Sequence, residues 1–306
     1  MNNRLKWLPG IAALSAASLC PALTVNIPAS KDNTLYESTA GNLSNGAGDN
    51  FFCGRTAQAS AYRRRGLIAF DLSAYIPAGS LINSASLTLY DSKGGNGSGT
   101  TVTLYRLNRA WTEGTSNAAN NEGQGIAVTG SGATWTHATY TSAPWASPGA
   151  AGTTDRSFTL SASLSIGTAA SAYTWTGLRN DVQAWVKTPS SNQGWILLGN
   201  ESTASTAVRF NSRTNPATAT RPVLTVDYSP ISPALSVQTV RLESGDILLT
   251  GTGQTGWQYD VEVSDDLQQW ASQGMATLAA NGDITYTDTT ASAVSRRAYR
   301  LRTVLP

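Results

Sequence analysis

The stretch Ser84-Ala85-Ser86-Leu87-Thr88-Leu89-Tyr90 decides the fold class of this chain. Leu87 and Leu89 alternate with hydroxyl-bearing residues, so a strand here buries one face and exposes the other. The same alternation recurs at 101–104 and at 224–228. Short strands of this kind, repeated at close spacing, predict an all-β, jelly-roll-like β-sandwich rather than a parallel sheet crossed by helices.

One segment departs from the strand pattern. Leu178, Val182, Trp185 and Val186 recur at helical spacing, and Pro189 follows them. Because proline cannot continue a helix, we expect one short helix that ends before it. Its Trp185 is expected to pack over an end of the sandwich.

A second unit is expected after a proline-rich spacer. The two prolines within 229–234 favour an extended linker between 31–228 and 235–306. Beyond the linker, alternation restarts around Val261 and Val263. About seventy residues with short strands are typical of a small immunoglobulin-like or fibronectin-like β-sandwich.

Composition limits the classes of partner. Of 306 residues, only 13% are charged and the net charge is +2, so no global charge selects nucleic acid or an anionic membrane. Any preference for an anion must come from a local patch.

The N-terminus predicts secretion. Arg4 and Lys6 precede an apolar run at 7–19, and Cys20 begins a small-residue segment. This order is that of a signal peptide, here 1–22, and the run is shorter than the ~20 residues that span a bilayer. A buried helix and a lipid anchor at Cys20 remain alternatives. The localisation is therefore expected to be extracellular or at the cell surface.

Cleavage would leave one cysteine. Cys53 would then have no disulfide partner, and we interpret it as a small buried hydrophobic residue. A catalytic thiol would need a histidine, and His137, the single one, lies in a Thr-rich loop.

Nine short motifs follow one another through most of the larger unit. In order they are 31–37, 54–55, 65–73, 76–79, 84–90, 110–114, 145–149, 181–185 and 221–228. Together they resemble the DNRLRE family of secreted bacterial and archaeal proteins, although the first motif differs in letters from the segment that names the family. The resemblance implies a jelly-roll-like sandwich, and relatives include carbohydrate-binding modules for acidic polysaccharides such as alginate.

The last unit carries a second, shorter resemblance. The segment 259–267, Trp270, 287–289 and 298–300 are similar to small modules that end secreted verrucomicrobial proteins. The likeness implies spacing or attachment, with cell-surface or matrix proteins as partners.

A basic run marks the candidate binding site. Arg63, Arg64 and Arg65 are consecutive, so on a strand Arg63 and Arg65 share one face and Arg64 takes the other. The family motif implies that Arg65 pairs with a carboxylate, which leaves Arg63 and Arg64 for a ligand. Arginine forks match uronate carboxylates. The alternative is a solvated strand end that guards against edge pairing.

Residue type predicts further groups for the same site. Lys93 lies in a glycine-rich loop, and Tyr140 and Trp145, like Trp135, lie in loops where rings could stack on sugars. The predicted ligand-binding set is Arg63, Arg64, Lys93, Tyr140 and Trp145. In contrast, Trp175, Trp185 and Trp195 lie inside regular elements and are expected in the core.

Cofactors and catalysis have little sequence support. Asp32, Asp71 and Asp91 are a hypothetical calcium set, since calcium often links sandwich loops through oxygen ligands, but no cofactor is required. Four carboxylates could supply a glycosidase pair, and no spacing selects two of them. They are Glu113, Glu122, Asp155 and Glu201.

The sequence therefore predicts a secreted, non-catalytic protein that binds or attaches to an extracellular polysaccharide, with an acidic polymer such as alginate favoured. A structural cell-surface or matrix protein without a sugar ligand is the alternative. A polysaccharide lyase or hydrolase is the less favoured one.

Overall fold

The computed structural model describes residues 22–94, 99–230, 236–253, 258–294 and 296–304. These residues form two compact units that divide after Pro230. The predicted signal peptide lies outside the described residues except for its last position, and so do much of the glycine-rich loop and most of the linker. Within the described part of the chain, no helix is both long and apolar enough to cross a membrane.

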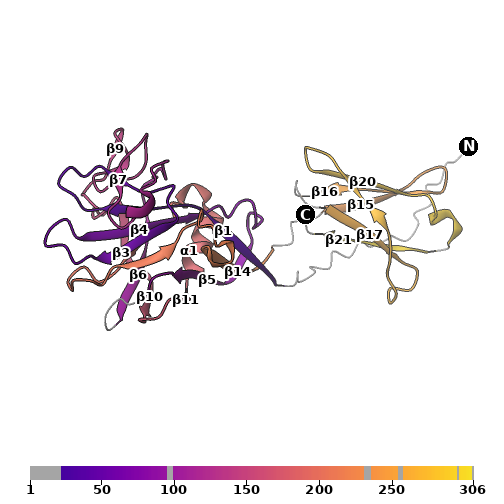
Figure 1. Ribbon diagram of the computed structural model, residues 1–306. Coiled ribbons are helices and arrows are strands. Elements are labelled where there is room, and N and C mark those ends of the chain that lie inside the picture. Colours follow the sequence, from indigo (N-terminus) through magenta and orange to yellow (C-terminus); the bar gives the residue numbers. More distant parts are fainter. Residues whose placement is uncertain (1–21, 95–98, 231–235, 254–257, 295, 305–306) are drawn as a thin grey trace, which may run out of the picture. The chain divides into compact units, whose positions relative to one another are not determined.

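The larger unit is almost entirely β-structure (Figure 1). Its strands are β1 (Leu23–Tyr36), β2 (Leu43–Ser44), β3 (Asn50–Arg55), β4 (Arg63–Phe70), β5 (Leu81–Asp91), β6 (Thr100–Leu107), β7 (Ile126–Ala127), β8 (His137–Thr139), β9 (Ala143–Pro144), β10 (Arg156–Ile166), β11 (Ser171–Trp175), β12 (Trp195–Leu198), β13 (Val208–Asn211) and β14 (Val223–Ser229). Its helices are α1 (Arg179–Lys187) and the short 3₁₀ turns Ala119–Asn121, Pro189–Ser191 and Thr218–Thr220.

The unit has two antiparallel layers, and the strands β1 and β3 pair with neighbours in both of them. In the first layer, β14 pairs with β1 and β5, and β5 and β3 both pair with β13. In the second layer, the C-terminal part of β1 pairs with β4. The strands β12, β6 and β10 continue this layer beyond β4, in that order. The all-β, jelly-roll-like sandwich predicted from the alternation is confirmed.

The main core lies between the layers, where the predicted alternation holds. Leu87 and Leu89 are fully buried, whereas Thr88 is half-buried on the opposite face of β5. Trp175 and Trp195 lie in the same core, as predicted. Cys53 is buried there as well, and burial raises the pKa of its thiol, which confirms it as a packing residue.

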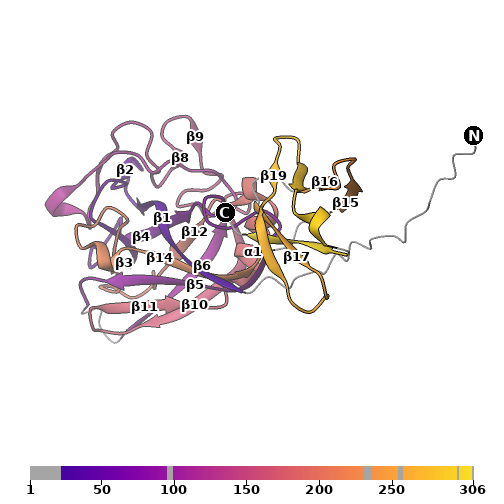
Figure 2. The same cartoon turned by 90° about the vertical axis from the view of Figure 1, so that its right-hand side faces the viewer.

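A second apolar cluster covers the outer face of the second layer. Leu67 of β4 and Ile196 of β12 point outward and are fully buried. The long connection between β6 and β10 covers them with Trp111, Trp135 and Trp145. Figure 1 places β7 and β9 of this connection, and Figure 2 its β8 and β9, on the side of the unit away from β10 and β11.

The predicted helix is present as α1. Val182, Trp185 and Val186 form its buried face. The Trp185 ring lies 4.5 Å from that of Trp195, whose indole nitrogen donates to Asp181 at 2.8 Å. The helix ends before Pro189, as the sequence predicts.

The smaller unit is a sandwich of two β-sheets. One sheet has the order β15 (Ser236–Arg241), β16 (Ile247–Thr252), β20 (Asp283–Asp288) and β19 (Thr277–Leu278). The other has β18 (Ala271–Met275), β17 (Gln258–Ser264) and β21 (Ala298–Val304), and a 3₁₀ turn spans Ala291–Ala293. Val261 and Val263 are buried between the sheets, so the second predicted β-sandwich is also present.

Candidate functional site

The basic run on β4 is occupied by contacts within the protein. Arg63 and Arg65 share one face, as predicted, and their guanidinium carbons lie 5.2 and 5.0 Å from the Trp135 ring centroid. Arg63 forms an ion pair with Glu37, and Arg65 binds Glu201 through two nitrogens at 2.7 and 2.9 Å. The carboxylate partner expected for Arg65 is therefore present. The expectation that Arg63 is free for a ligand is wrong.

Arg64 is a support rather than a ligand group. Its residue is only 2% exposed, and its Nε donates to the Gly123 carbonyl at 2.9 Å. Its guanidinium carbon lies 5.1 Å from the Tyr36 ring centroid, and burial lowers the pKa of Arg64. The expectation that this side chain is free is also wrong, because a loop closes over it.

The loop aromatics are not exposed platforms. Trp145 is 4% exposed and donates to the Thr134 carbonyl at 2.9 Å, and Trp135 is 6% exposed. Both predicted exposures are wrong because the outer face of the second layer needs an apolar cover. Tyr140 is half-buried, with its ring 5.3 Å from that of His137.

The three aspartates of the calcium hypothesis serve separate turns and strands. Asp32 is buried and accepts the Arg213 amide, Asp71 accepts from Ser73, and Asp91 accepts the amides of the turn after β5. Across the described ranges, no group of three or more histidine, cysteine or acidic residues is placed to hold a metal ion. The structure therefore does not bring Asp32, Asp71 and Asp91 together.

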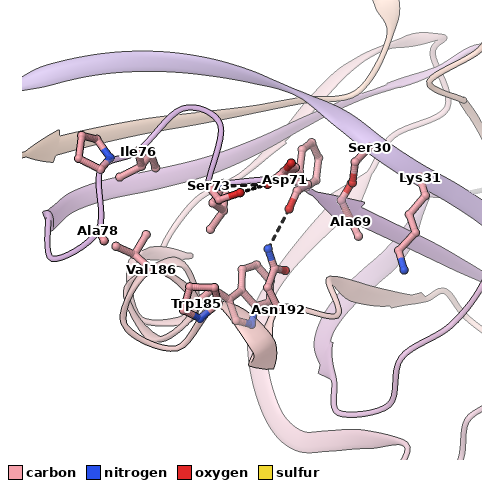
Figure 3. A pocket seen from close by; sticks show the side chains of 14 residues that line it. Ser30, Lys31, Ala69, Asp71, Ser73, Ile76, Ala78, Trp185, Val186 and Asn192 are labelled. Carbon is pink, nitrogen blue, oxygen red and sulfur yellow. Dashed lines mark hydrogen bonds between the residues drawn. The ribbon is translucent and has the colours of Figure 1, made fainter. Parts of the chain in front are cut away.

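One hollow lies beside α1, with a volume of about 370 Å³ (Figure 3). Its wall is largely apolar and includes Trp185, which is 1% exposed. Two of its polar groups are already engaged: Asp71 accepts from the Ser73 hydroxyl, and Asn192 donates to the Phe70 carbonyl at 2.8 Å. This hollow offers few unoccupied hydrogen-bonding groups.

A larger and more polar cleft, of about 660 Å³, lies where β3, β5 and β13 meet a long loop. Among the five predicted ligand residues, Lys93 alone lines it. The cleft residues are Asp49, Phe52, Lys93, Asn117, Ala119, Asn120, Glu122, Gly123 and Arg209. We take this cleft as the candidate site.

The cationic wall of the cleft is held by its backbone. Asp91 accepts the amide of Lys93 at 3.0 Å and that of Gly94 at 3.1 Å, which fixes the turn. Arg209 donates from Nε to the Ser92 hydroxyl and from Nη2 to the Ser92 carbonyl, both at 3.0 Å. Lys93 itself is exposed, and no ion pair joins it to a residue in the described part of the chain.

The opposite wall is a loop that hydrogen bonds from β1 and β4 hold in place. Tyr36 donates its hydroxyl to the Glu122 carbonyl at 2.6 Å, next to the bond from Arg64 to Gly123. Ala119 adopts a φ of 46°, a strained left-handed conformation for alanine. Strain of this kind persists where surrounding contacts hold it, often at ligand sites.

Both hydrogen-bond donors and hydrogen-bond acceptors line the cleft. The Glu122 carboxylate accepts the Asn50 amide at 3.1 Å, and burial raises the pKa of Glu122. Asn117 is held by the Ala47 carbonyl, whereas Asn120 is exposed. Phe52 also lines the cleft, but it is only 8% exposed. The cleft can thus accept from hydroxyls, donate to them and attract an anion.

The match that bears on this site lies in the first half of the chain. Residues 24–143 match the model of Carbohydrate-binding module family 96. Every cleft residue except Arg209 falls inside the matched segment. The match supports a carbohydrate-binding module, in agreement with the predicted resemblance at that level. The likeness of the last unit to verrucomicrobial modules stays a prediction.

Other comparisons add little. No curated protein matches the chain. Among solved structures, it is similar to a beta-glucuronidase from Bifidobacterium dentium complexed with coumarin-3-O-glucuronide, at 8% identity and a TM-score of 0.19. That similarity covers 92% of this chain and 48% of the other, so this chain spans about half of the enzyme's length. A likeness this low supports no inference about function.

Sequence reasoning missed most of the cleft. Asn117, Asn120 and Glu122 lie in a loop without periodic pattern, and Arg209 lies more than eighty residues further along. The available signal was the polar asparagine cluster at 117–121, whose meaning depends on the strands it faces. Residue type alone found Lys93.

Proposed function

We propose that this protein is secreted and binds an acidic extracellular polysaccharide in the polar cleft without cleaving it. The observation that carries the proposal is the Lys93 ammonium, which has no ion-pair partner among the described residues, in a cleft that lies almost wholly within the segment matching a carbohydrate-binding module. Secretion rests on the sequence of residues 1–22. Attachment to surface or matrix proteins through residues 235–306 rests on the sequence resemblance.

The lining suits a uronate polymer. Lys93 and Arg209 supply positive charge for the carboxylate, while Asn120 offers an amide to ring hydroxyls. Asp49 and Glu122 accept hydrogen bonds from other hydroxyls. Alginate and polygalacturonate have this chemistry.

A non-catalytic role is supported by what the candidate carboxylates do. Glu113 pairs with Arg213, and Glu201 pairs with Arg65. The Asp155 carboxylate accepts three backbone amides, and that of Glu122 accepts the Asn50 amide. Each group has a structural partner that an acid or base in catalysis would have to give up.

Affinity electrophoresis tests the proposal. The purified chain is run against alginate, polygalacturonate and a neutral glucan, and each polymer is assayed for new reducing or unsaturated ends. We expect retardation by an acidic polymer and no new ends. No retardation by any polymer would favour a structural protein without a sugar ligand, and new ends would show an enzyme.

Variants place the binding in the cleft. Lys93→Ala should weaken retention about tenfold, since a charge-assisted bond contributes about 1.5–3 kcal/mol. Its melting temperature should not change, because the side chain is exposed. Lys187→Ala, an exposed lysine on α1, is the matched control. Equal loss in both variants would show nonspecific attraction.

A further inference from the structure

Arg156, at the start of β10, has an unusual environment outside the cleft. Its guanidinium carbon lies 4.8 Å from the Tyr105 ring centroid and 4.3 Å from that of Phe158. Nη1 donates to the Ser157 carbonyl at 3.3 Å. The buried Nε has no hydrogen-bond acceptor within the described residues. Two rings and one carbonyl therefore hold the guanidinium in place.

Among the described residues, no carboxylate forms a direct ion pair with Arg156, although Glu201 attracts it from a distance. On β4, which belongs to the same layer, Arg63 and Arg65 each bind a glutamate, whereas no ion pair joins Arg156 to any residue that the structure describes. Desolvation and, second, repulsion from Arg65 lower the pKa of Arg156. An oriented, partly desolvated cation without a counter-charge costs stability, and such costs often persist where a ligand supplies the missing partner.

The strand is distorted at this point. Arg156 pairs with Leu107 and Leu160 pairs with Tyr105, so β10 advances four residues while β6 advances two. Bulges of this kind re-aim side chains and are frequent beside binding sites. Here Phe158 is 57% exposed and Leu160 is 49% exposed. An exposed aromatic ring, that of Phe158, thus lies next to the Arg156 guanidinium.

We propose that Arg156, Tyr105 and Phe158 form a second saccharide contact, in which Arg156 binds a uronate carboxylate and Phe158 packs against a sugar ring. The proposal deepens the proposed function and rests on it, because it names carboxylated sugar units as the ligand. The contact shares no residue with the cleft. It therefore predicts that a long acidic polymer is held at two places on the larger unit.

The test compares polygalacturonate with fully methyl-esterified pectin, which lacks the free carboxylates. Arg156→Gln should weaken retention by polygalacturonate about tenfold and leave behaviour on the esterified polymer unchanged. Its melting temperature should stay equal or rise, because an uncompensated charge is removed. Arg179→Gln is the control, since Arg179 is exposed and also donates to one carbonyl, that of Ile82.

Unchanged retention of Arg156→Gln, or an equal loss in Arg179→Gln, would overturn the second contact. If Arg156→Gln does not fold, Phe158→Ser must still lose retention, and wild-type retention there would also overturn it. Lys93→Ala separates the two proposals: loss in that variant alone keeps the cleft and rejects the Arg156 contact. Loss of retention in Arg156→Gln alone keeps the Arg156 contact and rejects the cleft. If no polymer retains the wild type, both fail.

Discussion

Two cationic regions of the larger unit differ in what surrounds them. The run Arg63–Arg65 is the most conspicuous basic feature of the sequence, yet Arg63 and Arg65 bind glutamates and Arg64 lies under a loop. Lys93 is a single lysine in a glycine-rich turn, and it faces a polar cleft without an acidic partner among the described residues.

The difference shows that positive charge in a sequence does not identify a binding site for anions. An arginine whose guanidinium N–H groups already bind a carboxylate of the protein contributes to the fold and has few free donors for a ligand. A cation without a partner contributes less to the fold and more to recognition. Substitutions in the two regions should therefore affect different measurements.

The largest effect on stability is expected from Arg65→Ala. The Arg65 side chain is 8% exposed and also donates to the Gly149 carbonyl at 2.7 Å. Its removal leaves the half-buried Glu201 without its cation, so the loss should lie between the ~1 kcal/mol of a surface pair and the ~3–5 kcal/mol of a fully buried one. Urea denaturation followed by tryptophan fluorescence measures the loss. Arg65→Lys should lose less, and a loss below about 1 kcal/mol in Arg65→Ala would break the comparison.

Asp32 is the opposite case, a buried acid whose neighbouring cation is already taken. The Arg213 side chain binds Glu113, and the Asp32 carboxylate accepts the Arg213 backbone amide at 2.6 Å. Burial raises the pKa of Asp32 from 3.8 to about 8. The folded state thus holds a proton that the unfolded state releases, and stability falls as the pH rises from about 4 through about 8.

Asp32→Asn should remove this dependence. Between pH 5 and pH 7 the wild type should lose about 2–3 kcal/mol more than the variant, as measured by denaturant midpoints at each pH. Asp227→Asn is a control, since that aspartate is exposed to solvent and its pKa is lowered by bonds from Ser84 and Thr24. Parallel pH profiles for wild type and Asp32→Asn would contradict the assignment.

The smallest expected effect comes from releasing Arg63. Glu37→Gln removes a partly exposed ion pair and should cost about 0.5 kcal/mol. Because Arg63 then lacks its carboxylate, retention by an acidic polymer should rise slightly. Gel retardation on polygalacturonate measures this change. A decrease in retention would show that Glu37, rather than its release, assists binding.

Local pattern predicted what local contacts determine. The alternation at 84–90 predicted a strand with one buried face, and the spacing of Val182, Trp185 and Val186 predicted α1. The period-two rule also placed Arg63 and Arg65 on one face. These features depend on residues that are close in sequence, so they can be predicted from the local pattern.

The errors arose where distant segments meet. Trp145 lies in a loop, and nothing local shows that this loop covers the outward-facing Leu67 and Ile196. Likewise, the partner of Arg65 lies 136 positions away, at Glu201. The cleft is formed by β3, β5, β13 and a loop, so its lining could be recognised only after the strands were paired.

An amide ¹H–¹⁵N spectrum titrated with trigalacturonate tests the central claim most directly. The account predicts shifts at Lys93, at 117–123 and at Arg209, with Arg63 and Arg65 silent. Shifts confined to Arg63–Arg65, or a spectrum unchanged at saturating oligosaccharide, would contradict it.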